Sequence, residues 1–442
     1  MSATGELVSF VRRLDPVHIA ETTLHQASRC VLDLLGVAIA GTRTPMAQIS
    51  AQFAFEQFAA GKCTVIGARQ SLGVTGAAWV NCNAASALDL DDGHRMAMGH
   101  PGATVIPSAL AVAETAGVTG REFLAAIIAG YEVAVRASVA RVPWYKERMY
   151  SSGIWGVFGA AVAAGRLLGF DQATLQSAIG NAGSHGPFPP GGLQANHSMV
   201  KEVIGWAGMT GCAAALLAEE GFLGPEDILD YSGRWDTAPL LDGLGDPNRY
   251  AILDTYFKPY AVCRWAHSSV DGVLDLLTQH SIQPGDIRQI WVETFDEVTR
   301  LVNYAPRNAI AAQFSIPFAL AIAVLRRRIE PEDVSEANLR LPEILNLARK
   351  VEVVVDPEID AQFPAKTIAR VTIVTARGPV QTTVEYPRGN PENPLSDEAL
   401  AAKFRSLTIR IIGEQTCESL LAAIADLPQA PDVTAVTGCL AF

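Results

Sequence analysis

Ionisable side chains gather in a short stretch of the chain, where A-L-D-L-D-D-G-H-R is followed by M-A-M-G-H-P-G. Three carboxylates, two imidazoles and one guanidinium fall within it: Asp89, Asp91, Asp92, His94, His100 and Arg95. The pKa of histidine lies near neutrality, so His100 is suited to proton transfer, with Asp89 as the alternative base. The cluster therefore predicts acid–base chemistry, although any single aspartate could equally cap a helix or pair with Arg95.

The elements on either side of this cluster are predicted to be apolar helices. Gly93, Gly99 and the pair Pro101-Gly102 make regular structure improbable between them. We expect the next helix to begin near Ala103, where its unpaired N–H groups and positive dipole end would favour a bound anion beside His100.

A second group of polar residues runs from Lys258 to His267 and includes Cys263 and Arg264. Its cations are suited to hold a carboxylate. Cys263 with His267 as its base is a conceivable nucleophilic pair, although a structural cysteine is the simpler interpretation. Lys201, before an apolar helix, and Tyr150, before a glycine-rich run, are unremarkable by themselves.

Several classes of function are disfavoured. The histidines and aspartates could ligate zinc, manganese or iron, but no HxH, HxxxH or HxxE spacing supports a metal site. The run from Gly153 to Gly159 is not GxGxxG and follows no predicted strand, and no Walker A sequence is present, so no nucleotide cofactor is expected. The net charge of −12 disfavours nucleic acid and anionic membranes as partners, but not a small anionic substrate. Seven scattered cysteines without CxxC spacing, and no secretion signal, predict a cytoplasmic protein.

The chain of 442 residues is long enough for two domains. Helical periodicity dominates up to about residue 270, β-branched segments follow, and helical patterns return after a linker at 387–394. We predict a mostly α protein in which residues 1–269, completed by 396–442, form an all-helical domain and residues 270–395 form a smaller α+β domain. The predicted helices are 19–40, 46–60, 74–88, 104–116, 121–140, 153–168, 171–183, 205–220, 312–328, 396–404 and 414–425, and the predicted strands lie in 287–295, 351–356 and 368–385.

Taken together, these motifs resemble the MmgE/PrpD family, which includes 2-methylcitrate dehydratase, cis-aconitate decarboxylase and iminodisuccinate epimerase. The similarity runs nearly end to end. It includes A-L-D-x-D-D…H-P…P-A-L-A-x-A-E at 87–114, K-x-Y-x-x-C-R-x-x-H at 258–267 and N-P-L-S-D-E-x-L…K-F at 393–404. The chain departs from the family pattern at Tyr150, Gly93 and Ile204, where many members have His, Thr and a second His.

The resemblance implies a helical domain with an α+β lid domain, a homodimer, and no metal or organic cofactor. It places Asp89, His100, Lys201, Lys258, Cys263 and His267 around a pocket between the domains. We expect His100 or Asp89 to act as base, Lys201 and Lys258 to hold substrate carboxylates, and Tyr150 or His267 to donate a proton to a leaving hydroxyl. Arg95, Cys263 and His267 complete the predicted substrate-binding set.

The predicted activity is that of a cofactor-independent lyase that removes a proton next to a carboxylate of a small polycarboxylate. A hydro-lyase, catalysing dehydration, is the favoured form. An epimerase, isomerase or decarboxylase, a metal-dependent hydrolase and a non-catalytic binder of small acids are the alternatives.

Overall fold

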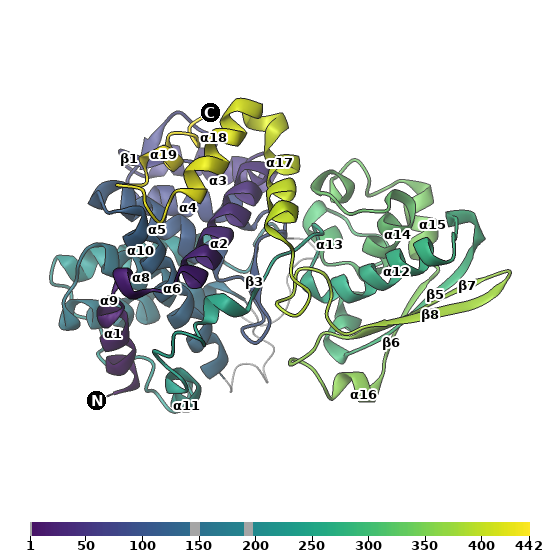
Figure 1. Cartoon of the computed structure of the whole chain (residues 1–442), viewed down its shortest axis with the longest axis horizontal. Helices are drawn as coiled ribbons and strands as arrows, with labels where there is room; N and C mark the ends of the chain where they lie inside the picture. Colours follow the sequence, from purple (N-terminus) through teal and green to yellow (C-terminus); the bar gives the residue numbers. More distant parts are fainter. Residues whose placement is uncertain (1, 142–150, 190–197) are drawn as a thin grey trace.

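The computed structural model describes residues 2–141, 151–189 and 198–442. Figure 1 shows a large helical part and, beside it, a smaller part built on a β-sheet. Each part has its own hydrophobic core. The mostly α architecture with a smaller α+β domain confirms the predicted fold class.

The large part is a bundle of helices rich in alanine and glycine. Small side chains let the helix backbones approach closely. A Cβ at Gly159 on α8, for example, would lie 2.6 Å from the carbonyl oxygen of Gly130 on α6. Its helices are α1 (Ala3–Arg13), α2 (Glu21–Gly41), α3 (Pro45–Gln57), α4 (Val74–Ser86), α5 (Gly102–Ala116), α6 (Gly120–Ala140), α8 (Gly153–Leu167), α9 (Gln172–His185), α10 (Ile204–Glu219) and α11 (Thr237–Leu241).

Helix α6 lies at the centre of this bundle. Thr119 and Glu122 form a capping box at its start, with each side chain bonded to the other residue's backbone N–H. The helix is long and apolar enough to cross a membrane, but 94% of its most apolar window is buried inside the structure. That burial is typical of the core helix of a folded domain.

Two short antiparallel pairs accompany the bundle: β1 (Ala60–Thr64) with β2 (Ser71–Leu72), and β3 (Gly93–His94) with β4 (Thr255–Tyr256). The second pair matters for function, because it fixes the 93–100 loop against the segment that leaves the helical part. A further bridge between His94 and Gly99 closes the loop on itself.

The smaller part is a four-stranded sheet with strand order β6-β5-β7-β8. Strands β5 and β6 are parallel, while β7 is antiparallel to both β5 and β8. The strands are β5 (Ile287–Thr294), β6 (Val351–Val355), β7 (Ala369–Thr375) and β8 (Gly378–Val384), and the helices are α12 (His267–Gln279), α13 (Ala309–Gln313), α14 (Ile316–Arg326), α15 (Pro342–Ala348) and α16 (Pro357–Asp360).

The helix predicted over 312–328 is two helices in the structure. Ser315 caps α14 by accepting a hydrogen bond from the Phe318 N–H, and Pro317 occupies the first turn, where its missing N–H costs nothing. The break leaves Gln313 at the end of α13, and this residue enters the site described below.

The chain returns to the helical part at its C-terminal end. Helices α17 (Asp397–Ile412), α18 (Glu414–Ala425) and α19 (Thr434–Thr437) lie against α2 and its neighbours (Figure 1). The outgoing and returning segments run side by side, since the Phe257 N–H donates to the Gly389 carbonyl at 3.0 Å. A Cβ at Gly389 would lie only 1.8 Å from the Phe257 oxygen, so this close approach requires glycine.

Candidate active site

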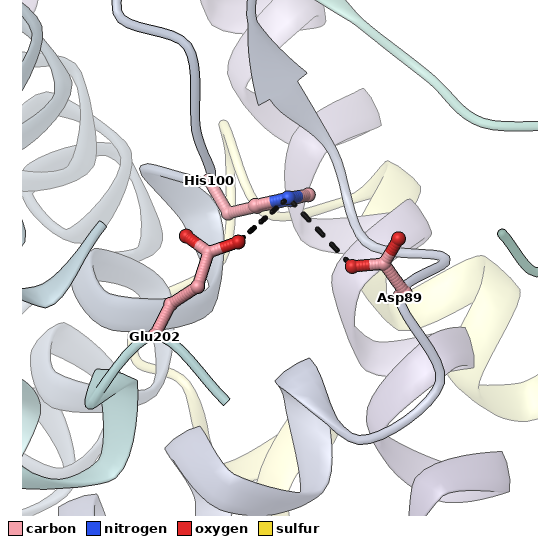
Figure 2. Close-up of side chains that lie close together, drawn as sticks. All are labelled: Asp89, His100 and Glu202. Carbon is pink, nitrogen blue, oxygen red and sulfur yellow. Dashed lines mark ion pairs between the residues drawn. The ribbon is translucent and has the colours of Figure 1, made fainter. Parts of the chain in front are cut away.

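His100 lies between carboxylates at the junction of the two parts. Its Nε2 is 3.9 Å from both Asp89 Oδ1 and Glu202 Oε1 (Figure 2). Its Nδ1 lies 2.9 Å from the Asp92 carbonyl oxygen and 3.1 Å from Asp91 Oδ2. Burial by itself would lower the pKa of His100, but the Asp91 carboxylate outweighs it, and the pKa rises to about 9. At neutral pH His100 is therefore a cation with a proton to give.

Asp89 is held by two ammonium groups. Lys201 Nζ lies 2.8 Å from Oδ1, and Lys258 Nζ lies 3.1 Å from Oδ2 and 2.8 Å from the Asp89 carbonyl oxygen. Burial would raise the pKa of Asp89, but the two lysines overcome it and hold that pKa well below its usual range. The two lysines thus neutralise Asp89 and hold it in place. We had expected both to hold substrate carboxylates, but neither lines the cavity described below.

Glu202 and Gln313 take part in this arrangement, although the sequence analysis did not single them out as site residues. Glu202 accepts hydrogen bonds from the Ser152 N–H, at 3.0 Å, and from the Ser152 hydroxyl. Gln313 accepts from Lys201 at 3.0 Å and donates to the Ala87 carbonyl at 3.0 Å. The only signal for Glu202 was its position next to Lys201, which is too weak to single it out.

The backbone at the site is unusual. Six non-glycine residues in the described ranges have positive φ, and four of them belong here: Asp89, Met98, Glu202 and Val203. Such conformations cost energy and gather at functional sites, where the surrounding structure imposes them. The strain at Asp89 and Glu202 fits a site that fixes its carboxylates before substrate arrives.

The start of α5 is not the free anion site that the sequence predicted. The Gly102 N–H donates to Asp92 Oδ1 at 3.2 Å, and the Tyr131 hydroxyl donates to Asp92 Oδ2 at 2.5 Å. Burial raises the pKa of Asp92 to about 7. The helix N-terminus is thus capped by a side chain of the chain itself.

The remaining predicted residues are distributed as follows. Cys263 lines the cavity, and burial raises the pKa of its thiol to about 12, so it is a poor nucleophile. His267 is fully buried, with Nε2 3.1 Å from the Val262 carbonyl and Nδ1 3.3 Å from Arg264, and it does not line the cavity. Arg95 does line it. Tyr150 lies outside the described residues.

A cavity joins the two parts. Among the described residues, the helical part contributes Arg95, His100 and Glu202 to its wall, and the smaller part and its connections contribute Arg264, Phe314 and Asn390. Cationic and acidic groups at one closed junction, beside apolar rings, are suited to bind a small anion and transfer a proton to it.

One alternative is a metal site, because ligand atoms of Asp89, His100 and Glu202 lie within 4.8 Å of one another. Asp89 Oδ1, however, already contacts the Lys201 ammonium, and Lys258 contacts Oδ2. A divalent cation there would face two ammonium groups and a charged imidazole, so the electrostatics disfavour it.

Comparison with known proteins agrees with this arrangement. Residues 5–240 match the MmgE/PrpD N-terminal domain and residues 260–429 match the MmgE/PrpD C-terminal domain. The chain is 27% identical to a cis-aconitate decarboxylase of Aspergillus terreus, over 98% of this chain and 94% of that protein. It is 25% identical to the cis-aconitate decarboxylase of Homo sapiens, over 99% of this chain and 94% of that protein. With both domains matched across most of its length, the chain belongs to the MmgE/PrpD family.

Proposed function

We propose that this protein is a lyase that acts on a small polycarboxylate and needs no cofactor, and that its reaction is a decarboxylation. The observation that carries the proposal is the position of His100 at the cavity wall among three carboxylates, which favours its protonated form. Similarity to two enzymes named cis-aconitate decarboxylase supports the same reaction class.

The chemistry of decarboxylation suits a site whose histidine starts as an acid. The bond between a carboxylate carbon and its neighbour breaks, CO₂ leaves, and the electron pair stays on the substrate. A proton from His100 Nε2 then completes the product, and solvent restores the proton to the imidazole. General acid catalysis of this kind contributes about 10²- to 10⁴-fold to a rate.

Dehydration is the second candidate, and Glu202 is the observation that favours it. Loss of water requires a base to remove a carbon-bound proton and an acid to protonate the departing hydroxyl. Glu202 lines the cavity with Oε1 3.9 Å from His100 Nε2, so a carboxylate base and an imidazolium acid lie side by side. Our first expectation was a hydro-lyase with His100 or Asp89 as base, but the charge of His100 fits the role of acid better.

Nuclear magnetic resonance of the purified protein in D₂O separates these reactions. The substrates are citrate, methylcitrate, cis-aconitate, tartrate and iminodisuccinate, each labelled with ¹³C in its carboxylates. Release of ¹³CO₂ with one deuterium in the product supports decarboxylation. An alkene formed from a hydroxy acid without ¹³CO₂ would establish dehydration instead, and deuterium exchange alone would indicate an epimerase. Absence of turnover on the whole panel would contradict the proposal.

A further inference from the structure

Arg264 is a buried cation without a carboxylate partner. Its side chain donates to the carbonyl oxygens of Arg388 and Pro387 and to the Asn390 side-chain oxygen, all of them neutral groups. Its remaining polar contact is His267 Nδ1, and burial keeps the pKa of His267 well below its usual value, so that ring is neutral. No ion pair joins Arg264 to an acidic side chain in the described ranges.

Three other buried cations in the described ranges do have carboxylate partners. Arg136 contacts Glu132 Oε1 at 2.7 Å, and Lys201 and Lys258 both contact Asp89. Buried charges are costly unless an opposite charge compensates them. Arg264 departs from this pattern, and it does so at the wall of the cavity that holds His100.

Arg95 has spare donors at the same cavity. Its Nη2 pairs with Glu392 Oε1 at 2.7 Å, whereas its Nε and Nη1 are buried and have no partner among the described residues. Buried donors without partners are rare, and an absent ligand or water is a common reason for them. Glu392 also accepts from Asn390 Nδ2 at 3.2 Å, and Asn390 accepts from Arg264, so one polar chain links the two guanidinium groups.

Gly93 leaves room for a ring that contacts Arg264. A Cβ at Gly93 would lie 2.3 Å from the Tyr256 hydroxyl, so a side chain there would displace the ring. The Arg264 guanidinium lies 4.5 Å from the centroid of the Tyr256 ring, a favourable cation–π contact. Glycine at position 93 therefore makes room for the ring that supports Arg264.

We propose that Arg264 and Arg95 form a carboxylate-binding subsite, which selects substrates that carry a second carboxylate away from the carbon that reacts beside His100. Guanidinium groups bind carboxylates through charge-assisted hydrogen bonds, and Arg95 has donors without a partner on both Nε and Nη1. The inference rests on the proposed function for the identity of the reacting end. It differs from our first expectation, because arginines rather than Lys201 and Lys258 supply the positive charge for substrate.

Calorimetric titration tests the subsite without requiring turnover. Propane-1,2,3-tricarboxylate and butyrate, which has a single carboxylate, are titrated into the wild type and into Arg95→Gln, Arg264→Lys and Arg405→Gln. Arg405 pairs with Glu418 on the surface and serves as the matched control. Loss of a charge-assisted contact predicts about a 10- to 100-fold weaker Kd for the tricarboxylate in the first two variants. The same variants should change the Kd for butyrate much less, and Arg405→Gln should change neither.

The outcomes separate the subsite from the chemistry. Tricarboxylate affinity within twofold of wild type in both Arg95→Gln and Arg264→Lys would overturn the subsite, even if the enzyme proves to be a decarboxylase. Absence of tricarboxylate binding to the wild type at millimolar concentration would overturn it as well. Arginine-dependent binding in a protein that turns over no polycarboxylate would leave the subsite standing and refute the proposed reaction. If Arg264→Lys fails to fold because Arg264 is buried, Arg95→Gln still tests the subsite, since Arg95 is partly exposed.

Discussion

Replacing Asp91 with asparagine should move the alkaline limit of activity toward neutrality. Asp91 Oδ2 lies 3.1 Å from His100 Nδ1, both groups are buried, and this carboxylate is the main influence that raises the pKa of His100 to about 9. Asparagine keeps the shape of the side chain and removes its charge. The sign follows directly: with less negative charge nearby, the imidazolium is less stable and His100 loses its proton at lower pH.

The size of the effect can be worked out from the His100 pKa. A single neighbouring charge at this distance shifts a pKa by about 1–3 units, so a fall of about two units places His100 near 7. At pH 8 the wild-type imidazole is then about 90% protonated and the variant about 10%. If protonated His100 is the acid, Asp91→Asn should lower kcat about tenfold at pH 8 and less than twofold at pH 6.

The assay is the pH dependence of kcat between pH 5.5 and 10, with NMR titration of the His100 ring as a readout that does not depend on turnover. Asp254→Asn is the control, since it removes an exposed carboxylate close to Arg95 rather than to His100. An alkaline limit for Asp91→Asn within half a unit of the wild-type value would refute the assignment of His100 as an acid whose pKa Asp91 raises.

Three further predictions follow from the same geometry. His100→Ala should lower kcat about 100-fold or more, and a rate within a few-fold of wild type would remove His100 from the chemistry. Asp89→Asn leaves the buried ammonium groups of Lys201 and Lys258 without their carboxylate. It should therefore lower the free energy of unfolding, measured by urea denaturation at pH 7, by about 3–5 kcal/mol. A decrease of less than about 1 kcal/mol would contradict this account of the ion pairs. Exhaustive chelation should leave kcat unchanged, whereas a loss that Zn²⁺ or Mn²⁺ restores would show that Asp89, His100 and Glu202 hold a metal after all.

Most of the helices could be predicted because apolar residues recur in them at three- and four-residue spacing, a local property of the sequence. The same reasoning failed at 314–315, where Ser315 and Pro317 start a new helix within an apolar run. Asp89 and His100 could be placed together because one short loop carries both. Lys201 and Lys258 reach Asp89 from 112 and 169 residues away, so only the resemblance to a family predicted their place in the pocket.

The residues that sequence reasoning missed owe their roles to contacts between distant segments. Gln313 meets Ala87 across 226 residues, and Glu392 meets the predicted Arg95 across 297. No periodicity or motif marks such pairs, because the packing of the two parts creates them. The homodimer and the cytoplasmic location stay predictions.

The paired crossing of the chain between the two parts determines how they could move. Because both crossing segments meet at the hydrogen bond between Phe257 and Gly389, a rotation of the smaller part about an axis near that bond would strain the chain least. Arg264 and Asn390 follow the crossing points Phe257 and Gly389 closely in the sequence, whereas His100 and Arg95 belong to the helical part. Groups near a rotation axis move least, so a small rotation of the smaller part would leave Arg264 and Asn390 close to their positions relative to His100 and Arg95.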